Sequence, residues 1–286
     1  MTPQRYVPPV AIEAQPKSRK SEESMRNILL TMFIFSSWLA TAAASDLEKE
    51  KRWSAQISDS LLTGEVCELK AGDTAFMGIY TEADAGPTGN AVILVHGIGA
   101  HPDWPEVIHP LRVGLPEHGW STLSVQMPVL ANDAELKDYL PLFDESGPRL
   151  KAAVDYLHQK GAKTVVIVAH SLGASMAARF VADNPGAVNG LVIIGMTVIE
   201  LDDKMNGALA LEKITLPVFD LYGSRDLDGV LASTDARARA AHKAGNSDYR
   251  QLAIEGGDHF YVGLEDELVR RVYGWLKAHY EQPTGN

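Results

Sequence analysis

The chain has 286 residues, 45% of them hydrophobic, and carries a formal net charge of -11 at pH 7. This length favours one large domain over two, and the acidic balance, without a basic stripe, argues against nucleic acid as a partner. Cys67 is the only cysteine, so no internal disulfide can form and the core must hold the fold together.

Residues 25–44 have the three parts of a secretory signal peptide. Arg26 supplies the positive start, Ile28–Leu39 forms an apolar core of 12 residues, and small residues occupy positions 42–44. Because a membrane-spanning helix needs about 20 residues, this core favours a cleaved signal over a permanent anchor. We therefore expect cleavage after Ala44.

Cleavage at this position divides the chain into a leader and signal peptide over 1–44 and a single folded domain over 45–286. The mature protein is then periplasmic or secreted, with no stable membrane insertion. The polar residues 1–24 either extend the leader or precede a true start at Met25. The competing interpretation is an uncleaved anchor formed by residues 28–44.

Helices and strands are expected to alternate through the mature chain. Residues 46–62 place Trp53, Ile57 and Leu61 on one helical face. The continuous apolar run Ala91–Val95 is typical of a strand buried on both faces. Further strands are expected at 64–69, 74–81, 120–125, 164–169, 191–195, 216–222 and 249–254, further helices at 106–118, 148–160, 174–182, 232–244 and 265–280, a long connection at 131–147, and a short irregular or helical insertion at 197–215. This alternation predicts a mostly parallel, doubly wound α/β sheet with helices on both faces.

The pentapeptide Ala169–Gly173 joins a buried strand that begins at Thr164 to the helix at 174–182. Its central Ser171 matches the G-x-S-x-G nucleophile elbow, with alanine in place of the first glycine. In such a turn the serine hydroxyl is exposed, and the small residues on either side let strand and helix approach closely. We predict that Ser171 is a nucleophile; an ordinary strand-to-helix loop is the plainer interpretation.

Two further reactive groups follow strands later in the chain. Asp226 comes after the penultimate strand and His259 after the last strand. Since the carboxyl ends of parallel strands meet at one edge of a sheet, these groups are expected to converge on Ser171. A serine hydroxyl needs a base, and the base needs an orienting group. His259 and Asp226 are predicted for these roles, with Asp228 as the alternative acid.

The loop that follows the strand at 91–95 is expected to lie beside the elbow. Backbone amides of Ile98 and Leu172 are the predicted oxyanion donors. The plainer interpretation of residues 100–105 is a rigid, proline-bracketed loop with its tryptophan packed beneath it. No cluster has metal-ligand spacing and no phosphate loop is present in the sequence, so neither a metal site nor a cofactor is expected. The possible pocket residues are His96, Gly97, His101, Asp103, Trp104 and His170.

The order nucleophile, acid, histidine resembles that of the α/β-hydrolase superfamily, and the resemblance runs from Gly64 to the C-terminus. The stretch Ala100–Glu106, which contains His-Pro-Asp-Trp-Pro, and the stretch Gly119–Pro128 are further similar to a proteobacterial family of exported proteins known only as α/β-hydrolase-like. These resemblances imply an α/β-hydrolase fold and export, and they carry little information about the substrate.

Residues 196–215 number only about 20, too few for an independent cap domain, so the site is expected to be open. We predict an exported serine hydrolase that cleaves a small-molecule or envelope acyl ester through an acyl-enzyme. Serine at the elbow argues against haloalkane and epoxide chemistry, in which a carboxylate attacks from this position. The alternative is a catalytically inactive binding protein of the cell envelope.

Overall fold

The computed structural model describes residues 44–281. The predicted signal peptide, up to residue 43, lies outside the described residues. Within the described part of the chain, no helix has both the length and the apolar character needed to cross a membrane.

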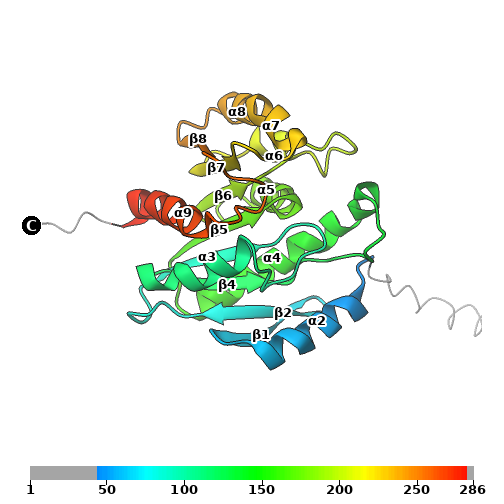
Figure 1. Ribbon diagram of the computed structural model, residues 1–286, viewed down its shortest axis with the longest axis vertical. Coiled ribbons are helices and arrows are strands. Elements are labelled where there is room, and N and C mark those ends of the chain that lie inside the picture. The colour runs from blue at the N-terminus through cyan, green and yellow to red at the C-terminus, as the bar shows by residue number, and fades with distance from the viewer. Residues whose placement is uncertain (1–43, 282–286) are drawn as a thin grey trace, which may run out of the picture. The chain divides into compact units, whose positions relative to one another are not determined.

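The described chain is built around an eight-stranded sheet with the strand order β1-β2-β4-β3-β5-β6-β7-β8 (Figure 1). The β1–β2 and β2–β4 pairs are antiparallel and all the other pairs are parallel. This topology confirms the predicted α/β class. The strands are β1 (Glu65–Ala71), β2 (Thr74–Thr81), β3 (Asn90–Val95), β4 (Ser121–Val125), β5 (Thr164–His170), β6 (Gly190–Ile194), β7 (Val218–Gly223) and β8 (Tyr249–Ile254).

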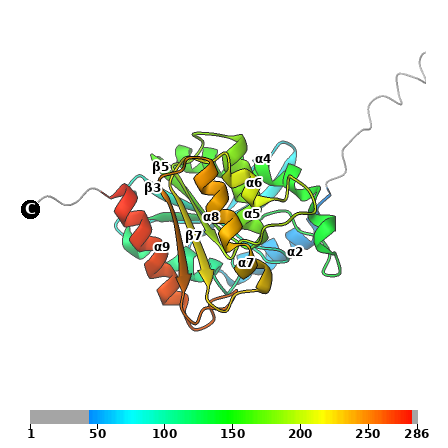
Figure 2. The same cartoon turned by 90° about the horizontal axis from the view of Figure 1, so that it is seen from above.

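Helices cover both faces of the sheet, because the central strands bury side chains on both sides. In β3, for example, Ile93 packs into the core under one helical layer and Leu94 into the core under the other. One layer holds α4 (Leu142–Gln159), α5 (Leu172–Asp183), α6 (Gly207–Leu211) and α8 (Thr234–Lys243), and the other holds α2 (Leu47–Ser60), α3 (Ile108–Gly114) and α9 (Glu265–Tyr280). Figure 2 shows β7 between α9 and α8.

The helix α4 begins six residues before the predicted start at 148, so Pro148 lies inside it. Proline in a helix interior costs about 3 kcal/mol because it removes one amide donor and crowds the preceding turn. Leu142 and Phe143 are 0% and 5% exposed, and burying each such side chain contributes roughly 1.5–3 kcal/mol. Burial of these two side chains outweighs the proline penalty and extends the helix.

Three other boundaries differ from the prediction. Helix α3 covers only part of 106–118, and the short 3₁₀ helix η1 (Pro116–His118) follows it. Pro110 is tolerated in the first turn of α3, where an amide has no partner in the helix. The predicted helix at 232–244 is found as α8, and a separate short helix, α7 (Asp228–Ala232), precedes it. The connection after β4 contains the 3₁₀ helix η2 (Leu136–Tyr139).

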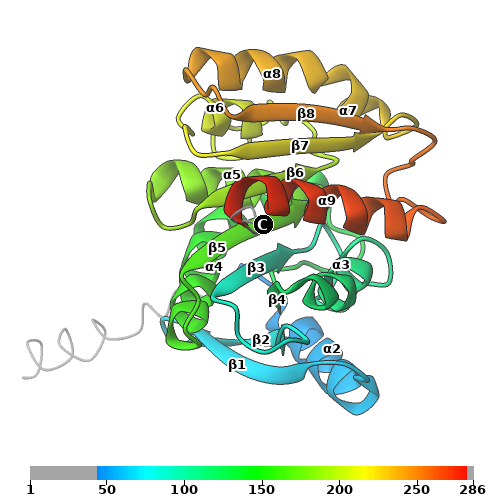
Figure 3. The same ribbon diagram turned by 90° about the vertical axis from the view of Figure 1, so that its left-hand side faces the viewer.

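The parallel strands deliver their carboxyl ends to one edge of the sheet. In Figure 3, β7 and β8 run in the same direction toward the connections that follow them. The insertion between β6 and β7 contains only the five-residue helix α6, in agreement with the expected lack of a cap domain. The loops after β3, β5, β7 and β8 therefore carry the candidate site.

Candidate active site

Ser171 lies at the sharp turn between β5 and α5. Its backbone has φ 55 and ψ -125, a region that is strained for any residue with a side chain. Such strain costs on the order of 1–3 kcal/mol and persists only where the surroundings enforce it. Here the Ser171 amide donates a hydrogen bond of 2.8 Å to the carbonyl of Ile194, at the end of the neighbouring strand β6.

Small residues let two loops approach the turn. A Cβ on Gly173 would overlap the carbonyl oxygen of His96, and a Cβ on Gly97 would lie 2.9 Å from Cβ of Ser171. Ala169 is fully buried and pairs with Val95 on β3, so the sheet accommodates its methyl group. These contacts explain why alanine can replace the first glycine of the elbow pattern whereas the second must be glycine.

The structure brings Ser171, His259 and Asp226 together in a line of hydrogen-bonding distances. Nε2 of His259 is 3.0 Å from Oγ of Ser171, and Nδ1 of His259 is 2.6 Å from Oδ1 of Asp226. When Nδ1–H donates to the carboxylate, Nε2 is left to accept the serine proton. His259 and Asp226 are 7% and 5% exposed, whereas Ser171 is half-buried.

The Asp226 carboxylate accepts two backbone hydrogen bonds in addition to the one from His259. The Gly223 amide donates to Oδ2 at 3.1 Å and the Leu227 amide donates to Oδ1 at 2.8 Å. Burial acts to raise the pKa of Asp226, but these donors outweigh it and the pKa lies below its usual value. Asp226 is therefore ionised at neutral pH and suited to stabilise a cationic His259.

Asp228, the alternative acid, does not reach His259. It is exposed in the first turn of α7, where its charge is favourable beside the helix N-terminus. In the described part of the chain, the carboxylate that contacts the His259 ring is that of Asp226.

The two predicted oxyanion amides flank Ser171. Leu172 is the first residue of α5, so its amide has no acceptor within the helix. The amide of Ile98 lies in the loop after β3, next to the glycine that contacts Ser171. Neither amide donates a backbone hydrogen bond anywhere in residues 44–281. Both donors are therefore available to a substrate oxygen.

His96 was a possible pocket residue, but the structure buries it. It is 1% exposed, and burial lowers its pKa to about 3, so the ring is neutral. Its Nδ1 donates to the carbonyl of Gly97 at 2.9 Å, and its Nε2 accepts from the amide of Met127 at 2.9 Å. The ring thus fixes the loop that carries Ile98 instead of facing a ligand.

His170, the residue before Ser171, contacts His259 instead of facing a pocket. Its Nε2 lies 2.9 Å from the carbonyl oxygen of His259. Burial lowers the pKa of His170 to about 4, so it donates this hydrogen bond as a neutral imidazole.

The segment from His101 to Trp104 also has a structural role. Asp103 was a possible pocket residue, but its Oδ1 accepts hydrogen bonds from Arg112 at 2.7 and 2.9 Å and from His109 at 2.9 Å. The ring of His101 lies between Trp53 and Trp104, 5.3 Å from each. The geometry favours the rigid-loop interpretation of this stretch.

Two glycine features were not predicted from the sequence. Gly195 follows β6 with φ +60, and a Cβ there would lie 3.0 Å from Cε1 of His259. A Cβ on Gly223 would overlap the carbonyl of Gly257, so the loops carrying Asp226 and His259 touch through their backbones. In the sequence, Gly195 could have been noticed as a glycine directly after a buried strand. Its contact with His259 was not visible there, because the two residues are 64 positions apart.

Large apolar side chains are exposed in the loops after four of the parallel strands. Each loop follows a carboxyl end on the same edge of the sheet as Ser171. These residues are Ile98 at 44%, Leu201 at 61%, Leu227 at 55%, Phe260 at 43% and Val262 at 65% exposed. Among residues 44–281, no group of three or more His, Cys, Asp or Glu side chains is placed to hold a metal ion.

Comparison with solved structures places this fold among α/β-hydrolases. Est1E from Butyrivibrio proteoclasticus is 15% identical with a TM-score of 0.61, over 77% of this chain and 100% of that one. A dienelactone hydrolase from Anabaena variabilis is 18% identical with a TM-score of 0.60, over 76% and 97%. The esterase Pf2001 from Pyrococcus furiosus is 16% identical with a TM-score of 0.61, over 78% and 95%.

No curated protein matches the chain by sequence. A protein-family model, described as protein of unknown function (DUF3530), matches residues 5–141 and 144–278. These segments include Ser171, Asp226 and His259. The chain belongs to the DUF3530 family, and its fold is that of the α/β-hydrolases.

Proposed function

We propose that the protein is an exported serine hydrolase that cleaves carboxylic esters through a covalent acyl-enzyme. One observation carries the proposal: a serine in a strained elbow, a histidine and an ionised aspartate are joined by distances of 3.0 and 2.6 Å. A serine at a strained turn, with a base and an orienting acid, is the arrangement that activates a serine hydroxyl.

In the acylation step, Oγ of Ser171 attacks the ester carbonyl carbon while its proton passes to Nε2 of His259. The carbonyl electron pair moves onto oxygen, where the amides of Ile98 and Leu172 stabilise the negative charge. When the tetrahedral intermediate collapses, the bond to the alcohol oxygen breaks. His259 then gives the proton to the departing alcohol, and Asp226 stabilises its cationic form throughout.

Deacylation repeats this chemistry with water. His259 accepts a proton from a water molecule as the water oxygen attacks the acyl carbon. Collapse of the second tetrahedral intermediate breaks the bond to Oγ of Ser171, which recovers its proton from His259. The carboxylic acid leaves, and the three side chains return to their starting protonation states.

Two further observations support an ester with an apolar acyl group. Several solved structures of similar fold are those of esterases or hydrolases. The exposed apolar residues around the carboxyl ends of the strands offer a surface for an acyl chain. The short insertion that contains α6 leaves this surface without a separate cap domain.

Labelling with a fluorophosphonate probe tests the enzyme proposal. The probe phosphorus bonds to an activated serine oxygen with loss of fluoride. We expect the wild-type protein to be labelled, Ser171→Ala to be unlabelled, and the control Ser175→Ala to be labelled as wild type. Labelling that persists in Ser171→Ala would identify a different nucleophile. An unlabelled wild type would favour the alternative of a non-catalytic envelope-binding protein.

Export forms the second part of the proposal. The sequence over 25–44 has the charge, apolar core and small-residue end of a signal peptide. Cell fractionation of a host that expresses the full chain tests it: the processed protein should appear in the periplasm or medium. A protein that stays in the cytoplasm, or a full-length chain held in the membrane fraction, would contradict export with cleavage.

A further inference from the structure

A buried charge cluster joins the start of the described chain to α4. The side chains of Arg149 and Glu50 are 1% and 7% exposed. They form a bidentate ion pair, with distances of 2.8 Å from Nη1 to Oε2 and 3.1 Å from Nη2 to Oε1. Glu145, one turn before Arg149, places its Oε2 3.9 Å from Nη2. The three side chains together carry two negative charges and one positive charge.

The uncompensated carboxylate of Glu145 points at the backbone of Ser45. Oε1 accepts hydrogen bonds from the amides of Ala44 at 2.6 Å and Ser45 at 3.2 Å. Oε2 accepts from the Ser45 hydroxyl at 2.7 Å. Ser45 is 7% exposed whereas Ala44 is exposed. Glu145 therefore holds both the amide and the hydroxyl of Ser45, just before α2 begins.

A net negative charge in a poorly solvated cluster is unfavourable. Burial raises the pKa of Glu50, Arg149 opposes this effect, and the charge of Glu145 adds to it. One more cation beside Glu145 would balance the cluster. The peptide nitrogen of Ser45 is neutral while the chain continues upstream, but it becomes an ammonium if the bond between Ala44 and Ser45 is cut.

We propose that Ser45 is the first residue of the mature protein and that its α-ammonium group forms a partly buried ion pair with Glu145. The nitrogen is already 3.2 Å from Oε1, so the ion pair forms without rearrangement. The inference rests on the proposed export and cleavage and is independent of the proposed hydrolysis. In this proposal, the carboxylate of Glu145 binds the α-ammonium group of the new N-terminus.

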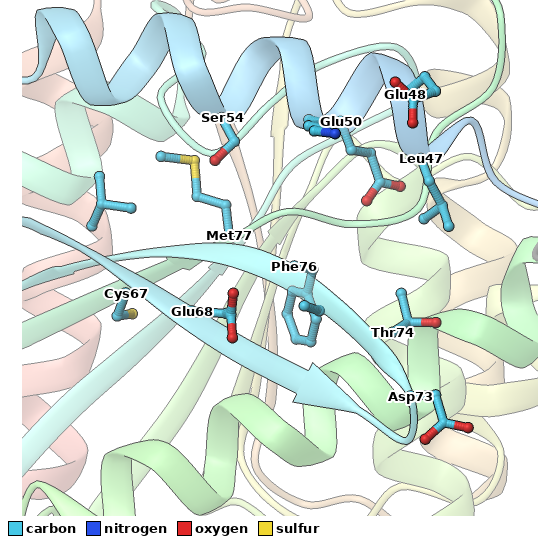
Figure 4. Close-up of a pocket in the computed structure, with 13 residues that line it drawn as sticks. Leu47, Glu48, Glu50, Ser54, Cys67, Glu68, Asp73, Thr74, Phe76 and Met77 are labelled. Carbon is cyan, nitrogen blue, oxygen red and sulfur yellow. The ribbon is translucent and has the colours of Figure 1, made fainter.

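The cluster also borders two other parts of the protein. Arg149 donates from Nη1 to the carbonyl of Gln126 at 2.9 Å. The next residue, Met127, donates its amide to the ring of His96. Its guanidinium lies 5.2 Å from the ring of Phe76. Glu50 and Phe76 both line a groove of about 580 Å³ between α2 and the β1–β2 hairpin (Figure 4). The N-terminal ion pair would thus stabilise the packing of α2 on the sheet, close to the loop that carries Ile98.

The first test identifies the N-terminus. The full chain is expressed in an exporting bacterial host, and the processed protein is examined by intact mass and N-terminal sequencing. Ser45 is the expected first residue, and a different first residue overturns the proposal. In the native protein the α-amine should react with an amine-directed ester at least about tenfold more slowly than in urea, because ion pairing and burial protect it. Equal rates would also overturn it.

The second test is a double-mutant cycle. One change is Glu145→Gln, which keeps the hydrogen-bonding shape and removes the charge. The other inserts two glycines between Ala44 and Ser45, so that cleavage after Ala44 moves the ammonium about 7 Å away along the chain. Asp144→Asn is the matched control, because Asp144 is exposed on the same helix and pairs with Lys204.

Urea unfolding of the processed proteins gives the readout. Each single change should increase the unfolding equilibrium constant about tenfold to a hundredfold, the range for a charge-assisted hydrogen bond. The double variant should be no worse than either single variant, because both remove the same ion pair. Additive effects, or a Glu145→Gln effect no larger than that of Asp144→Asn, would overturn the proposal.

Discussion

His170 donates a hydrogen bond of 2.9 Å from Nε2 to the backbone carbonyl of His259, and the two rings lie 4.7 Å apart. His170, which precedes Ser171, therefore holds the main chain of His259. This contact couples the elbow after β5 to the loop after β8 independently of the bond between Ser171 and His259. It explains how a loop residue at the edge of the sheet keeps its ring in place.

Replacing His170 with phenylalanine retains a buried ring and removes the hydrogen bond to His259. We expect kcat for ester hydrolysis to fall about tenfold to a hundredfold, because small displacements of a base have effects of this size. KM should change little, since His170 is buried and does not face the apolar rim. Steady-state kinetics with a p-nitrophenyl ester measures both constants. An unchanged kcat would show that His259 does not depend on this contact.

Stability should fall as the pH is lowered from about 6.5 toward 4. Burial lowers the pKa of His170 to about 4 and that of His96 to about 3. Below pH 6.5 the unfolded chain binds protons at these positions and the folded chain does not, so the free energy of unfolding decreases. Each histidine contributes a slope of roughly 1.4 kcal/mol per pH unit in this window. Urea unfolding at several pH values should show a shallower slope in His170→Phe.

Asp226→Asn should lower ester turnover by about 10⁴-fold while the protein stays folded, because the amide cannot hold His259 in the tautomer that accepts the serine proton. Asp228→Asn provides the matched control and should stay within about twofold of wild type, since Asp228 is exposed. Comparable losses in the two variants, or an active Asp226→Asn, would contradict the assignment of the acid.

Gly195→Ala should impair the base. The new Cβ would lie 3.0 and 3.1 Å from ring atoms of His259, and the position has φ +60. Gly186→Ala is the control, because it has φ +83 and open space around the new Cβ. Both variants should lose about 1 kcal/mol of stability from backbone strain. Only Gly195→Ala should lose activity, by tenfold or more; equal activities would show that His259 tolerates the contact.

The exposed apolar loops predict a preference for longer acyl chains. In a series of p-nitrophenyl esters, kcat/KM should rise by up to about fourfold for each methylene that the rim covers. Phe260→Ser should flatten this dependence, because Phe260 follows the base and is 43% exposed. Leu62→Ser is the control: Leu62 is 98% exposed and lies at the end of α2. A flat series in the wild type would contradict an acyl site on this rim.

Periodicity and position along the chain predicted the sheet and the convergence of Ser171, Asp226 and His259. Each of these residues lies in the loop after a strand whose apolar run is visible in the sequence, so a parallel sheet is enough to bring them to one edge. The nearby Asp228 illustrates the limit of this reasoning. Spacing along the chain left both aspartates open, and the turn geometry after β7 decides which one reaches the histidine.

What the sequence did not reveal depends on contacts between distant side chains. Asp103 lies in a loop beside the site, but its carboxylate forms an ion pair with Arg112 on α3. The early start of α4 depends on how Leu142 and Phe143 are buried, which local propensity does not report. His96 is buried and therefore neutral, and its ring accepts a hydrogen bond from the amide of Met127 in the loop after β4.

The edge position of β8 has a consequence for synthesis. This strand pairs only with β7, and His259 follows it near the end of the described chain. The ribosome therefore makes Ser171 and its strained elbow 88 residues before it makes the base. A chain truncated before β8 contains Ser171 but lacks the histidine that lies 3.0 Å from its hydroxyl. The proposed activation of Ser171 therefore requires that the chain has been made at least as far as His259.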